Sequence, residues 1–207
     1  MPEMILDAFL AQLMSSARLT AENVLDLRRD VFADGVMTRG EAQMLLDLDK
    51  ACADSCAEWK MFMNEAVSDY IVHQERPSGY ISQDNAVWLR KTLEASDPRT
   101  AASVLAHVLE KAKSAPEQLS EFGLRTVAKS VLANDGGKPH ISSEDVGMLR
   151  RILYAFGGEG GVGLTRQEVE VLFDLNDQTA EALNDPQWHD LFTKAVASFI
   201  LCVSGYQ

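Results

Sequence analysis

The sequence predicts an all-α protein of about ten helices, and two observations carry this prediction. Apolar residues recur three and four positions apart, as at Val24, Leu25, Leu27 and Val31, and strand-like alternation is absent. The second observation is an internal repeat, in which a unit of about 60 residues with three helices occurs three times. Because hydrophobic residues make up 46% of the 207, we expect one compact domain over residues 1–207.

The predicted elements follow one another without a long linker. An amphipathic stretch at residues 3–16 predicts a first helix, and the three units cover residues 19–78, 81–138 and 141–203. Each unit opens on an apolar residue followed by Ser or Thr, and the three openings start 62 and 60 residues apart. The first and third units match to their ends: Trp59, Ala66, Val67, Tyr70 and Ile71 match Trp188, Ala195, Val196, Phe199 and Ile200 at identical mutual spacing.

The predicted helices share a way of starting. Thr38 with Glu41, and Thr165 with Glu168, have the spacing of a capping box, in which hydroxyl and carboxylate each accept a free backbone N–H of the first turn. The apolar residue before each cap is expected to pack on the fourth helical position as a hydrophobic staple. This pattern is a folding signal and accounts for these residues without a ligand.

The net charge restricts the classes of partner. Nineteen basic residues against 31 acidic ones give a formal net charge of −12, which argues against a nucleic-acid partner and against an anionic membrane surface. The longest apolar run, residues 195–203, is far shorter than the roughly 20 residues of a membrane-spanning helix. The acidic N-terminus does not resemble a signal peptide, and three cysteines fit a reducing compartment. We therefore expect a cytoplasmic protein with no membrane insertion.

Residues 30–41 invite a sharper hypothesis. Counted as an EF-hand loop, they place acids at the first, fifth and twelfth positions, which are Asp30, Asp34 and Glu41, and glycine at the sixth. Calcium prefers six to eight oxygen ligands, and this loop offers those carboxylates and the Val36 carbonyl. Phe32 stands where a third-position ligand is expected. The weak resemblance to an EF-hand gives one alternative function, a degenerate calcium-binding protein with Ca²⁺ or another divalent cation at this loop.

Motifs of catalysis are missing from the chain. No zinc-hydrolase, nucleophile-elbow or phosphate-loop pattern occurs, so we expect no enzyme and no cofactor. Asp47 and Asp49, with Asp174 and Asn176 at the matching positions of the third unit, are polar residues within predicted helices. Carboxylate chemistry built from Asp47 and Asp174 is the second alternative function.

The junction Ala33-Asp34-Gly35-Val36-Met37-Thr38-Arg39-Gly40-Glu41 resembles the TerB-like, or tellurite-resistance-like, family of all-helical proteins. The resemblance implies a cytoplasmic, non-enzymatic helical module that is linked to stress and to tellurite resistance. It also implies interaction with proteins or metal ions through acidic surfaces, and makes Asp34 and Glu41 the matched acidic positions. The leading hypothesis is therefore an acidic helical scaffold that binds a protein partner, and we expect that partner to carry a basic surface or a metal ion.

Overall fold

Helices make up most of the chain that the computed structural model describes, which is residues 10–133, 137–155 and 164–205, and the all-α prediction is confirmed. Residues 10–16 are helical, as predicted, while residues 3–9 of that predicted helix lie outside the described residues. The elements that follow are β1 (Arg18–Leu19), α2 (Ala21–Asp26), η1 (Leu27–Val31), α3 (Arg39–Ala51), β2 (Asp54–Ser55), α4 (Ala57–Asp69), η2 (Tyr70–Gln74), α5 (Gln83–Glu94), α6 (Pro98–Lys111), α7 (Glu117–Leu132), α8 (Ser143–Leu153), α9 (Arg166–Gln178) and α10 (Pro186–Ser204).

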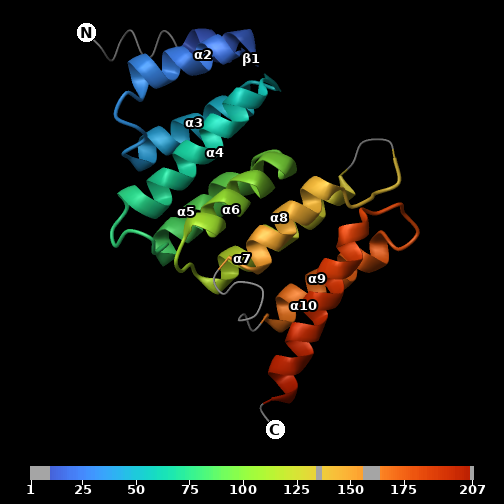
Figure 1. Cartoon of the computed structure of the whole chain (residues 1–207). Helices are drawn as coiled ribbons and strands as arrows, with labels where there is room; N and C mark the ends of the chain where they lie inside the picture. The colour runs from blue at the N-terminus through green and yellow to red at the C-terminus, as the bar shows by residue number, and fades with distance from the viewer. Residues whose placement is uncertain (1–9, 134–136, 156–163, 206–207) are drawn as a thin grey trace.

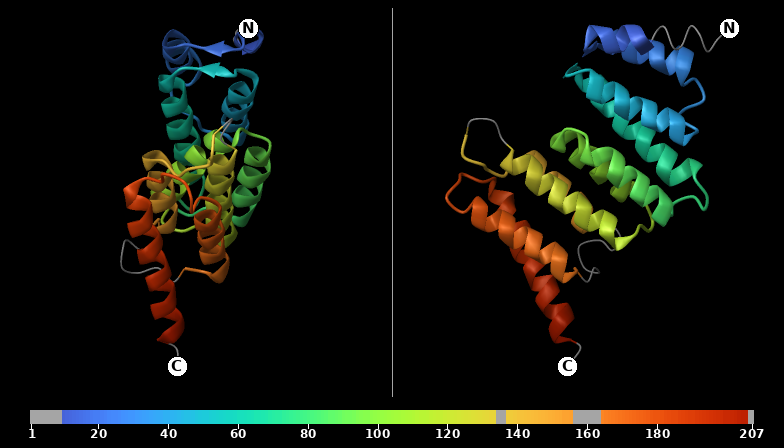
Figure 2. Two further views of the ribbon diagram at one scale, coloured as in Figure 1. Left: turned by 90° about the vertical axis from the view of Figure 1, so that its right-hand side faces the viewer. Right: turned by 180° about the vertical axis from the view of Figure 1, so that it is seen from behind.

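The helices form one continuous stack in chain order, with α2 at one end and α10 at the other (Figure 1). Most contacts join helices that are close in the chain: α4 packs on α6, α6 on α7 and α8, α7 on α9, and α10 on α8 and α9. The same order is visible from behind (Figure 2). The predicted units each contain three of the α-helices: α2–α4, α5–α7 and α8–α10.

A short backbone contact ties the beginning of each predicted unit to the start of its third helix. In the first unit this contact is the parallel pair β1–β2, two residues long, which is too short to leave any alternating pattern in the sequence. Three backbone hydrogen bonds make the contact: Cys56 N–H to the Leu19 carbonyl (3.0 Å), Ile81 N–H to the Ser114 carbonyl (3.0 Å), and Asp185 N–H to the Ile141 carbonyl (2.8 Å). These shared contacts support the predicted repeat.

The predicted capping boxes at Thr38 and Thr165 are confirmed, and Thr20 and Ser142 form two more. Ser82 caps α5 through its hydroxyl alone. Each such cap stabilises its helix by about 1 kcal/mol. The apolar residues before four of these caps are buried, whereas Met37 is exposed: the four are Leu19, Ile81, Ile141 and Leu164.

Candidate functional site

The predicted calcium loop runs from η1 into the first turn of α3, and its acids are engaged in local bonds. One Glu41 carboxylate oxygen accepts the N–H groups of Met37 (2.8 Å) and Thr38 (2.9 Å), as a capping residue does. Asp30 accepts two hydrogen bonds from the guanidinium of Arg29, both 2.8 Å long, and these bonds lower the pKa of Asp30. Asp34, the third acid of the loop, lies in the turn before α3.

The structure does not bring Asp30, Asp34 and Glu41 together. Within the part of the chain that is described, no three His, Cys, Asp or Glu side chains form a group that could hold a metal ion. Phe32, in the position of a third ligand, is buried and contacts the ring of Phe62 at 6.1 Å between centroids. Calcium binding at this loop stays a prediction, and a bound cation would have to compete with the N–H groups that Glu41 accepts.

The two carboxylates of the predicted enzyme site lie far apart in the stack, because α3 and α9 are separated by the middle helices (Figure 1). Asp47, on α3, accepts a hydrogen bond from Gln43 (3.0 Å) and pairs with Lys50 at 3.5 Å. Asp174, on α9, lines an open surface hollow of about 470 Å³ together with Arg125 and Lys129 of α7. The structure therefore does not assemble one acid–base pair from Asp47 and Asp174.

Asp49 is the carboxylate with the more unusual surroundings. It lines a cavity of about 340 Å³ between the end of α3, the start of α4 and the start of α6, together with Lys60 and Thr100. The Trp59 indole N–H donates to it at 2.8 Å. Burial raises the pKa of Asp49, and burial together with this carboxylate raises the pKa of the Cys52 thiol. A thiol with a raised pKa stays protonated, so Cys52 is a poor nucleophile.

The same indole contact recurs in the third unit with a neutral acceptor. Trp188 donates its indole N–H to the Asn176 side-chain oxygen at 3.3 Å, and Asn176 stands where Asp49 stands in the first unit. Both tryptophans are buried. Because an amide serves in one unit and a carboxylate in the other, the contact requires an oxygen acceptor and does not require a charge. This geometry is typical of a structural contact that positions the third helix of the unit.

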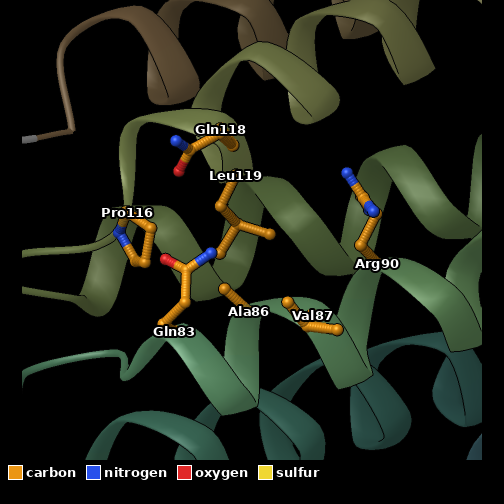
Figure 3. Close-up of a pocket in the computed structure, with 7 residues that line it drawn as sticks. All are labelled: Gln83, Ala86, Val87, Arg90, Pro116, Gln118 and Leu119. Atoms are coloured by element: carbon orange, nitrogen blue, oxygen red, sulfur yellow. The ribbon is translucent and has the colours of Figure 1, made fainter.

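A third cavity, between α5 and α7, is too small for a ligand. Ala86 and Val87 face Pro116 and Leu119 across it, with Gln83, Arg90 and Gln118 at its margin (Figure 3). Its volume is about 20 Å³. That is room for about one water molecule.

Several large apolar side chains are exposed close together in the C-terminal half of α10. The first half of α10 packs on α8 and α9 through Trp188, Leu191 and Ala195, which are buried. Beyond it, Ile200 is 56% exposed and Leu201 71% exposed. Both orientations show this end of α10 extending past the body of the stack (Figures 1 and 2). We call the exposed side chains of Ile200, Leu201 and Val203, with the half-buried Phe199 that packs on the core beside them, the α10 surface.

The matching face of the first unit is covered. Ile71, which matches Ile200, and Val72, which falls where Leu201 does, are both 0% exposed. The next unit supplies the cover, since α6 packs on α4 and η2, and Trp88 of α5 contacts the Tyr70 ring edge-on at 6.2 Å. No described helix plays that part for the C-terminal half of α10. Among the residues that the structure describes, the α10 surface is therefore a unit-stacking face without a cover.

Sequence reasoning judged the apolar run of residues 195–203 too short for a membrane span and matched it to the third helix of the first unit, but did not predict its exposure. None of the described helices is long and apolar enough to cross a bilayer. The available signal was the absence of any charged residue from 195 to 205, on a helix whose apolar residues do not keep to one face.

Comparison with protein-family models, with curated proteins and with solved structures finds no match to this chain.

Proposed function

We propose that the protein is a non-enzymatic helical interaction protein that binds a protein partner through the α10 surface. The observation that carries the proposal is the exposure of Ile200 and Leu201, whose counterparts in the first unit are fully buried. A helix that is apolar on all sides is normally buried, and clustered exposed apolar side chains mark interaction sites. A partner helix or groove would remove this surface from water, as α6 does for the first unit.

The remaining features agree with a scaffold role. A continuous stack of helices offers long lateral surfaces, which is how helical repeat proteins hold partners. The net charge of −12 favours a basic rim on a partner and disfavours nucleic acid. The TerB-like resemblance at residues 33–41 implies the same class of function, a cytoplasmic module that works by interaction.

The two alternative functions have weaker support. For calcium binding, the Glu41 carboxylate is engaged by two backbone N–H groups and Asp30 by Arg29. For carboxylate catalysis, Asp47 and Asp174 lie in different parts of the stack, and the indole contact of Asp49 recurs with a neutral amide.

The test is affinity capture from the source cytoplasm with three versions of the full chain, each with and without chelator. The versions are the parent, Leu201→Asp, and the matched control Leu25→Asp, whose side chain is 64% exposed on α2 at the other end of the stack. In the complex, a carboxylate at position 201 would be buried with no opposite charge beside it. We therefore expect Leu201→Asp to lose the bound protein. Leu25→Asp and the parent should retain it with or without chelator.

Equal capture by all three versions would contradict the proposal, because the α10 surface would then take no part in binding. Loss of capture with chelator alone would favour the metal-dependent alternative. Thermal denaturation of the three versions checks that the substitutions leave the fold intact.

A further inference from the structure

We infer that the cavity around Asp49 is a binding site for a small zwitterion, of which a free α-amino acid is the simplest kind. The site is separate from the α10 surface and stands independently of the proposed function. Its cavity of about 340 Å³ lies where the first two units meet, because Lys60 is on α4 of the first unit and Thr100 is on α6 of the second. Ligand pockets in proteins begin at about this volume.

The fold does not require the negative charge of Asp49. Its Oδ1 atom accepts the Trp59 indole N–H at 2.8 Å, and in the third unit the neutral Asn176 accepts the equivalent N–H of Trp188. Burial raises the pKa of Asp49, so the ionised form of this carboxyl is disfavoured in the folded chain. A carboxylate that lines a cavity, and whose charge opposes folding while an amide would serve the fold, is typical of a functional residue.

A second carboxylate lines the same cavity. Asp97, the N-cap of α6, uses its Oδ1 atom to accept the backbone N–H groups of Arg99 (3.0 Å) and Thr100 (3.1 Å). Burial is the main cause of the raised pKa of Asp49, and the negative charge of Asp97 adds to it. Among the described residues, neither carboxylate forms an ion pair. A cationic group bound to both would relieve their repulsion.

The oxygens of the cavity suit an ammonium group. The hydroxyls of Ser55 and Thr100 line it together with the two carboxylates. Two carboxylates and a hydroxyl match the three N–H donors of an ammonium group, whereas Ca²⁺ takes roughly six to eight oxygen ligands. An ammonium group is therefore the cation that these residues complement.

Lys60 supplies the opposite charge. It lines the cavity from the start of α4, and its charge partly offsets the effect of burial on the pKa of Asp49. Lys60 forms no ion pair among the described residues, whereas the other lysine of the cavity, Lys50, pairs with Asp47 at 3.5 Å. Two carboxylates and one unpaired lysine complement a ligand that carries an ammonium and a carboxylate close together, as an α-amino acid does.

The experiment is isothermal titration calorimetry of the full chain with each standard L-amino acid, followed by two analogues of the tightest binder. The analogues are the amine that lacks its carboxylate and the carboxylic acid that lacks its amino group. We expect at least one amino acid to bind. Both analogues should bind at least about tenfold more weakly, because each leaves charged groups of the cavity without a partner.

Three variants assign the charges. Asp49→Asn should weaken binding of the amino acid at least about tenfold, while thermal denaturation without ligand shows no loss of stability, because the amide keeps the acceptor for Trp59. Lys60→Met should weaken binding of the amino acid and leave binding of the amine analogue unchanged. Glu58→Gln is the matched control for charge, since Glu58 is exposed on α4 outside the cavity lining, and it should bind as the parent does.

Hydrogen exchange locates the ligand on the chain. The amino acid at saturating concentration should slow amide exchange at the boundary of the first two units, in residues 49–60 and 95–100, and leave α8–α10 unchanged.

The absence of binding heat with every amino acid at millimolar concentration would overturn the inference. So would binding that Asp49→Asn leaves unchanged, or protection from exchange that is confined to α8–α10. An amine analogue that binds as tightly as its amino acid would also overturn it, because the ligand carboxylate would then play no part.

Discussion

Asp49 and Asn176 occupy matching positions, and each accepts the indole N–H of a buried tryptophan from the third helix of its unit. One is ionisable and the other is neutral, so the pair is an internal control for the role of charge. Burial raises the pKa of Asp49, which means that its ionised form is less favoured there than in the unfolded chain.

Asp49→Asn should leave the free energy of unfolding near neutral pH equal to or above that of the parent, because the acceptor for Trp59 is kept and the buried charge is removed. Asp49→Ala should lower it by about 1–3 kcal/mol, since it leaves the buried indole N–H of Trp59 without a partner. Asn176→Ala is the matched control for the loss of an acceptor. Urea denaturation measures all three, and an Asp49→Asn loss as large as that of Asp49→Ala would show that the charge itself is required.

The pH dependence of this effect follows from the direction of the shift. A carboxyl whose folded pKa is raised makes its most favourable contribution to stability below its unfolded pKa, and loses it as the pH rises through the folded pKa. The same direction holds for Glu168, whose pKa is also raised by burial. Any excess in the free energy of unfolding of Asp49→Asn over that of the parent should therefore shrink as the pH is lowered from about 7 toward about 4.

α4 with η2 and α10 are the two third helices that the sequence aligns most fully, yet their surroundings differ. In the first unit, Val67, Tyr70 and Ile71 are buried under the next unit. In the third unit, one face of the first half of α10 is buried, whereas Ile200, Leu201 and Val203 in its second half are exposed. The same pattern of residues therefore makes different contributions to stability in the two places.

Ile71→Ala should lower the free energy of unfolding by about 2–5 kcal/mol, because it leaves a cavity in a packed core. Ile200→Ala, the same substitution at the matching position, should change the free energy of unfolding by less than about 0.5 kcal/mol, because that side chain is 56% exposed. Urea denaturation of the two variants and the parent makes the comparison. Similar losses in the two variants would mean that residues around Ile200 are packed in the isolated chain.

The molecule as a whole is a row of helices in which most contacts join near neighbours along the chain. In such an architecture stability is close to a sum of terms for each unit and for the contacts between adjacent units. Local openings are then expected to stay local. A defect at one end of the stack should be felt little at the other.

Leu172→Ala should raise amide hydrogen exchange in α8–α10 by at least about tenfold and leave α2–α4 nearly unchanged, because the cavity weakens the last unit. Leu45→Ala, at the matching position of the first unit, should do the reverse. Leu172 and Leu45 are both buried, so the two substitutions remove similar packing. Exchange measured by mass spectrometry decides the point, and a uniform increase along the whole chain in both variants would rule out unit-by-unit stability.

The correct sequence predictions concern features that nearby residues settle among themselves. A capping box joins residues three apart, so Thr38 with Glu41 and Thr165 with Glu168 are legible without knowledge of the fold. The π-helical turns η1 and η2 and the pair β1–β2 were not predicted, since a short sequence window carries no signal for them. Asp30, Asp34 and Glu41 have the order of a calcium loop in the sequence. Local donors hold two of the three in the structure: Arg29 donates to Asp30, and the backbone N–H groups just before α3 donate to Glu41.

Helix class, helix starts and the matching of the first unit with the third follow from the amino-acid sequence, because capping and helical periodicity act over a few residues. Exposure does not follow from it. Ile71 and Ile200 have the same identity in the same pattern, and one is fully buried while the other is 56% exposed. α6 packs beside Ile71, and no described helix takes that place beside Ile200. Burial depends on which surfaces meet in space, and the sequence pattern does not state this. The position of the α10 surface at the uncovered end of the stack could be seen only once the helices were packed.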